Sequence, residues 1–162
     1  MRLTRRETVS AGPDEVYATL VDPAFQEAKC QATEAESYDV SVTETSVGHD
    51  VRTTRVLPSR DLPDVARSFV GEQLTVVETY EWGAPAPDGT REAVLDLHVK
   101  GAPLTLKGTV RLEPDGGGTL ELLDAELKAN VPFVGGKIEQ AASTPIGAAI
   151  DTEIRMLRER LG

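Results

Sequence analysis

Residues 135–161, GGKIEQAASTPIGAAIDTEIRMLRERL, carry the pattern that decides the fold. Apolar side chains recur about every fourth residue, and charged residues such as Asp151, Arg155 and Arg158 lie between them; the apolar members are Ile138, Ala142, Ile146, Ile150, Ile154, Leu157 and Leu161. This period predicts a long amphipathic helix with one buried face, which Pro145 should kink or restart. All four isoleucines of the chain fall in this segment, so we expect the helix to have its own packing surface.

The segments before this helix alternate apolar and polar residues with a period of two, which is typical of strands with one buried face. We expect strands over residues 2–9, 38–44, 51–57, 74–82, 95–99, 104–112 and 120–131, with a bulge where the apolar phase slips between Leu122 and Leu123. Short helices are expected over residues 13–21, 24–32 and 61–71, the last capped by Asp61. The order predicts an α+β chain, residues 1–162 forming a single domain, in which a curved antiparallel sheet of about seven strands wraps around the C-terminal helix.

The composition excludes several classes of partner. The chain has 17 basic and 27 acidic residues and a formal net charge of -10, which repels nucleic acids and anionic membrane surfaces. No apolar stretch is long enough to cross a bilayer and no apolar run follows the basic residues near the N-terminus, so we expect a soluble, cytoplasmic protein without membrane insertion. Nothing in the sequence indicates a protein partner.

The residues that could hold a metal are few and far apart. Cys30 is the single cysteine, which excludes an internal disulfide, and we expect it to be a structural, half-buried thiol. His98 lies on the polar phase of its strand and His49 in a hairpin turn, so both are expected at the surface. We therefore expect no metal site and no cofactor.

Several short motifs carry a resemblance to a known superfamily. They are VYATLVDP at residues 16–23, DLP at 61–63 with FVG at 69–71, VVETYEW at 76–82, and VGGKIE at 134–139. With the order of the elements, they resemble the START-like superfamily, also called SRPBCC, of polyketide cyclases and birch-pollen allergens, and within it an uncharacterised bacterial family. The resemblance spans nearly the whole chain. It implies the helix-grip fold, with two short helices after the first strand and an apolar cavity between sheet and C-terminal helix, but no catalytic residues.

The inward phases of the expected strands and helices indicate which residues would line such a cavity. We expect its wall to include Val42, Arg55, Phe69, Val76, Glu78, Tyr80, Leu95, Leu97, Leu106, Val110, Leu127, Ile138, Ala142 and Ile146. Three charged residues share apolar phases: Glu78 that of Val76 and Tyr80, Arg55 that of its own strand, and Glu44 that of Val42. A charge on an apolar phase is paired, solvated or functional, and a structural Glu78–Arg55 pair is one interpretation.

Three classes of function fit these patterns. The first is a carrier or sensor that binds a small apolar ligand (a lipid, a sterol-like molecule or an aromatic polyketide-like molecule), because the sequence has no dense group of nucleophiles, bases or metal ligands. The second is a cyclase, dehydratase or hydrolase with Glu78 as general acid or base and Tyr80 or Arg55 orienting the substrate. The third is a protein-interaction module with an acidic surface. The short helix with Phe69 would either cover the cavity mouth or cap the edge of the sheet.

Overall fold

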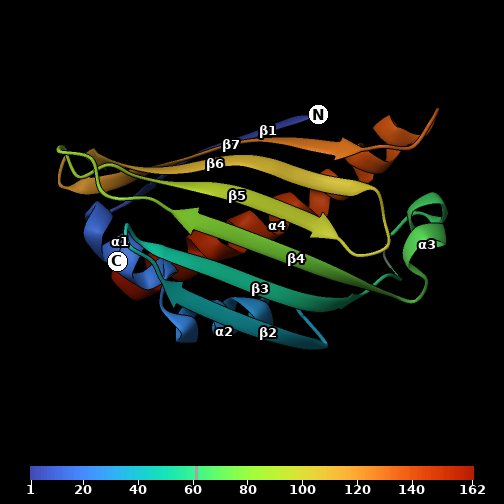
Figure 1. Ribbon diagram of the computed structural model, residues 1–162, viewed down its shortest axis with the longest axis horizontal. Helices are drawn as coiled ribbons and strands as arrows, with labels where there is room; N and C mark the ends of the chain where they lie inside the picture. Colours follow the sequence, from blue (N-terminus) through green and yellow to red (C-terminus); the bar gives the residue numbers. More distant parts are fainter. Residues whose placement is uncertain (61) are drawn as a thin grey trace.

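The computed structural model describes residues 1–60 and 62–162. Its described residues form a seven-stranded antiparallel sheet and four helices, with α4 running along one face of the sheet (Figure 1). The elements are β1 (Arg2–Val9), α1 (Pro13–Leu20), α2 (Pro23–Ala32), β2 (Ser37–Glu44), β3 (His49–Pro58), α3 (Asp64–Val70), β4 (Gln73–Trp82), β5 (Arg91–Val99), β6 (Leu104–Asp115), β7 (Gly118–Ala129) and α4 (Gly135–Leu161). The α+β class and the helix-grip arrangement are confirmed.

The strand order is β1-β7-β6-β5-β4-β3-β2, so the strands from β2 to β7 pair with their neighbours in the sequence. The exception is β1, which crosses to the far edge and pairs with β7 from Arg2–Glu126 to Val9–Thr119. Helices α1 and α2 occupy the connection from β1 to β2, and each begins with a proline in its first turn. The side chain of Asp22 caps α2 by accepting a hydrogen bond from the amide of Ala24 (2.9 Å).

The bulge predicted in the last strand is wrong. β7 keeps an unbroken register with β6, from Leu104–Ala129 to Asp115–Gly118, and with β1 on its other side. Its regular alternation turns Leu123 and Leu127 inward together with Glu121, whereas Leu122 is only partly buried. The apparent slip in the apolar phase arises because a glutamate occupies a buried position of the strand.

The helices differ from expectation in two details. α4 is continuous from Gly135 to Leu161, with Pro145 inside it, so the predicted restart does not occur. α3 begins at Asp64 after Pro63, which makes no side-chain cap, and the predicted capping residue, Asp61, lies outside the described residues. At its own end of the sheet, α3 lies beside the turn between β5 and β6, while α1 and the C-terminus lie at the opposite end (Figure 1).

Candidate functional site

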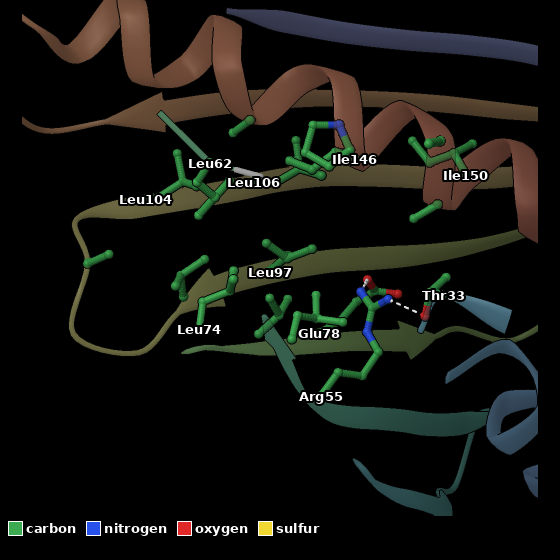
Figure 2. A pocket seen from close by; sticks show the side chains of 18 of the residues that line it. Thr33, Arg55, Leu62, Leu74, Glu78, Leu97, Leu104, Leu106, Ile146 and Ile150 are labelled. Carbon is green, nitrogen blue, oxygen red and sulfur yellow. Dashed lines mark hydrogen bonds and ion pairs between the residues drawn. The ribbon is translucent and has the colours of Figure 1, made fainter. Parts of the chain in front are cut away.

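A cavity of about 410 Å³ lies between the sheet and α4 and extends to α3. This volume falls within the range of about 300–1,000 Å³ that is usual for small-molecule sites. Most of its wall is apolar, with side chains from β3 to β7, from the α3 segment and from α4 as far as Glu153 (Figure 2). The polar side chains of the wall include Lys29, Thr33, Arg55, Glu78 and Glu153.

Most of the cavity residues expected from the sequence lie on this wall. They are Arg55, Phe69, Val76, Glu78, Tyr80, Leu95, Leu97, Leu106, Ile138, Ala142 and Ile146. Their role in binding a ligand stays a prediction.

Val42, Val110 and Leu127 were expected on the wall but are not part of it. Leu127 is fully buried in the packed core, Val110 borders a separate void of about 10 Å³ next to Trp82, and Val42 is partly buried on the edge strand β2. Strand phase specifies the face of the sheet a residue occupies, but it carries no information on where along the strand α4 leaves space.

Four charged side chains meet at one place on this wall. Lys29 Nζ lies 3.3 Å from Glu78 Oε1 and 2.7 Å from Glu153 Oε2, and Arg55 Nη2 lies 3.5 Å from Glu78 Oε2. Arg55 Nη1 also donates a hydrogen bond to Thr33 Oγ1 (2.9 Å; Figure 2). We call Lys29, Arg55, Glu78 and Glu153 the charged cluster; it joins α2, β3, β4 and α4.

The charged cluster holds Glu78 in its ionised form. Burial acts to raise the pKa of Glu78, but the ammonium of Lys29 and the guanidinium of Arg55 outweigh burial and lower the pKa below its usual value. Burial acts to lower the pKa of Lys29, and the carboxylates of Glu153 and Glu78 raise it above its usual value. The pKa of Tyr80, two residues along the same face of β4, is raised by burial and by the charge of Glu78, so its hydroxyl stays protonated.

Comparison with known families shows which family the chain belongs to. Residues 4–161 match the model of a family described as "Protein of unknown function (DUF2505)". The chain belongs to this family. A relative of this DUF2505 chain, "Uncharacterized protein Rv0481c" of Mycobacterium tuberculosis, is 29% identical over 108 residues, which make up 65% of this chain and 62% of the relative. The matched part thus spans less than two thirds of the relative's length.

Solved structures similar to this DUF2505 chain share its fold at low sequence identity. One is the STAR-related lipid transfer protein from Xanthomonas axonopodis, with a TM-score of 0.60, 16% identity, and coverage of 97% of this chain and 85% of that chain. Another is the Zhui aromatase/cyclase from Streptomyces sp. R1128, with a TM-score of 0.61, 15% identity, and coverage of 99% and 93%. Both similarities show that this DUF2505 chain shares the fold of these two proteins, which is the fold that its motifs implied.

Sequence reasoning missed two members of the charged cluster in this DUF2505 chain. Lys29 follows Phe25 and Gln26 at helical spacing, and all three are buried on the inner face of α2. Glu153 precedes the buried Ile154 on α4. A signal existed for Lys29, since it lies on the same helical stripe as Phe25. The prediction that Glu44 shares the inward phase of β2 is wrong, because Glu44 lies exposed at the end of this strand.

Another buried acid of this DUF2505 chain was also missed. Glu121 on β7 is 5% exposed, and no partner of its Oε2 atom lies among the described residues. Burial and the nearby charge of Glu153 raise its pKa to about 8. Unlike Glu78, it is not part of the cavity wall. Its signal was hidden by the bulge inferred at Leu122 and Leu123, which assigned the residues before it to the wrong face.

The structure also places the cysteine and the two histidines of this DUF2505 chain. Cys30 is fully buried rather than half-buried, and burial raises the pKa of its thiol. The side chain of His98 is 44% exposed, as expected of a surface residue, whereas His49 is partly buried and its Nδ1 lies 2.6 Å from the hydroxyl of Tyr17. In the range that the structure describes, no three His, Cys, Asp or Glu side chains group as metal ligands would. None of the described helices is long and apolar enough to cross a membrane.

Proposed function

We propose that the protein binds a small hydrophobic ligand, of the lipid, sterol-like or aromatic polyketide-like type, in the cavity between its sheet and α4. The observation that carries this proposal is the cavity itself, whose wall is mostly leucine, isoleucine, valine and alanine. Each Å² of apolar surface removed from water contributes about 25 cal/mol, so a ligand that fills the cavity would be held mainly by burial. The lipid transfer protein and the aromatase/cyclase of the same fold support a role in handling such molecules.

A carrier or sensor agrees better with the charged cluster than an enzyme based on Glu78. A general acid or base near neutral pH needs a pKa close to the working pH. The pKa of Glu78 is instead lowered, because Lys29 and Arg55 both pair with its carboxylate. Such a carboxylate is a weak base and carries no proton to donate, so its position favours binding and structure over proton transfer.

Binding can be tested with Nile red, an uncharged dye whose fluorescence rises in apolar surroundings. We expect saturable binding to the wild-type protein. Leu97→Trp should weaken it about tenfold or more, because the larger side chain fills space in the cavity where Leu97 lines the wall. The matched control is Val94→Trp on the outer face of the same strand, where Val94 is 54% exposed. Equal binding by the two variants, or none by the wild-type protein, would contradict the proposal.

A further inference from the structure

The polar groups of the cavity are confined to one part of its wall. The charged cluster and Thr33 lie together, while Leu62, Leu74 and Leu104 lie toward the turn between β5 and β6 (Figure 2). A ligand that fills the space therefore meets an apolar surface at one end and charged side chains at the other. This arrangement favours one orientation of an amphipathic molecule inside the cavity.

The charged cluster is already neutral as a whole. Lys29 and Arg55 contribute two positive charges, and Glu78 and Glu153 two negative charges, joined by contacts of 2.7–3.5 Å. The side chains of these four residues are between 6% and 13% exposed. An ionic head group placed beside them would bring one uncompensated charge into a buried site, which is strongly unfavourable. Glu34 also borders the cavity, but it is exposed, so solvent and salt screen its charge.

Arg55 has more N–H groups than the charged cluster and Thr33 engage. A guanidinium offers five N–H groups and an ammonium three. Arg55 directs Nη1 at Thr33 and Nη2 at Glu78, and each of these two nitrogens carries a second N–H group. Both oxygens of Glu78 contact cations. Arg55 therefore has N–H groups to spare, and a ligand would complement them with an acceptor oxygen.

We propose that the ligand is an uncharged amphipathic molecule that directs an acceptor oxygen of the carbonyl class toward Arg55 and its apolar body toward Leu62, Leu104 and Ile146. This inference rests on the proposed function and adds the chemistry of the head group to it. The donors of Arg55 bind the oxygen, and the balanced charges of the cluster reject carboxylate and ammonium head groups of the same chain length.

Displacement of Nile red by four 12-carbon competitors tests the inference at neutral pH: dodecane, 2-dodecanone, dodecanoate and dodecylammonium. We expect 2-dodecanone to displace the dye at concentrations about tenfold lower than each of the other three, since one hydrogen bond to a charged group is worth about that factor. Equal potency of all four, or a preference for an ionic competitor, would overturn the inference while leaving hydrophobic binding intact. Failure of Nile red and of every competitor to bind would overturn both.

Two variants test the roles of donors and charge separately. Arg55→Lys keeps the cation beside Glu78 but reduces the donors, so the ketone should lose its advantage over dodecane while dye binding persists. Glu78→Gln leaves two cations against Glu153 alone, so the preference should change to dodecanoate. The control, Arg52→Lys, alters an exposed residue of the same strand and should leave the order of competitors unchanged. An unchanged order in both Arg55→Lys and Glu78→Gln would refute the assignment of the head group to the charged cluster.

Discussion

The two halves of α4 carry the same apolar stripe but meet the sheet in different ways. In the part of α4 that ends at Glu153, Ile138, Ile146 and Ile150 border the cavity, and the last two are only partly buried. In the second half, Ile154 is 3% exposed and Leu157 is fully buried in the packed core. We call these the cavity half and the packed half. One helix thus closes a core at one end of the sheet and leaves space at the other.

The contrast between the two halves shows what the amphipathic pattern can predict. It predicts which side of α4 faces the sheet, but not how closely that side packs against it. The stripe predicts that both halves of α4 turn toward the sheet, and they do. Whether side chains then interlock depends on what the sheet and the other helices offer opposite them. At the packed end, Tyr17 of α1 meets Trp82 edge to face, with ring centroids 5.5 Å apart. At the cavity end the wall contains many alanines, which reach less far into the space.

A substitution in the charged cluster should have the largest effect on stability, because the cluster joins α2 and β4 to α4 through buried charges. Lys29→Met would leave the carboxylate of Glu153 without the partner that lies 2.7 Å away. We expect the free energy of unfolding to fall by about 3–5 kcal/mol, as when one partner of a buried ion pair is removed.

Urea denaturation measures this change, with Lys100→Met as the control at an exposed lysine. Equal stability of the two variants would mean that the charged cluster does not hold α4 to the rest of the fold.

A second expected effect is on the pH dependence of stability, and it arises from Glu121, which lies outside the cavity wall. The native pKa of Glu121 is about 8, above the value of 4.5 for an ordinary glutamate. Its contribution to stability is therefore complete below about pH 4.5 and is lost as the pH rises toward about 8, because the unfolded chain releases this proton first.

Glu121→Gln replaces the titrating carboxyl by an amide that does not ionise. Between about pH 5 and pH 7.5 the wild type should lose about 1.4 kcal/mol of stability per pH unit from this group. The variant should therefore lose about 3 kcal/mol less than the wild type over that range. Urea denaturation at a series of pH values measures the two slopes. Parallel slopes would show that Glu121 ionises in the native protein as easily as in the unfolded chain.

The smallest expected effect compares one truncation in each half of α4. Leu157→Ala in the packed half should cost about 3 kcal/mol, because it leaves a void in a filled core. Ile146→Ala in the cavity half should cost about 1 kcal/mol, because it widens a space that already exists and its side chain is only partly buried. The order of the two values in the absence of ligand, measured by urea denaturation, tests the comparison. Equal costs would mean that both halves are packed alike.

The sequence predicts the elements of this fold well, because each strand and helix buries one face with a clear period. The inward positions of Glu78 and Arg55 follow from the same rule, as does the apolar face of α4. The buried position of Glu121 was not predicted, because a polar residue on the buried face of a strand produces the same sequence pattern as a bulge.

The partners in the charged cluster could not be predicted, since Lys29, Glu78 and Glu153 lie far apart in the chain. The limits of the cavity along each strand were equally hidden, as Val110 and Leu127 illustrate. Both properties depend on how α2, α4 and the sheet meet in space, and the pattern within a single element contains no information on that.

Native mass spectrometry tests the central claim most directly, because it detects a small molecule held in the cavity without assuming its identity. We expect the protein, purified without detergent or after incubation with 2-dodecanone, to carry a defined additional mass that is lost on denaturation and is reduced in Leu97→Trp relative to Val94→Trp. The bare polypeptide mass under both conditions, for the wild type as for the variants, would contradict the account.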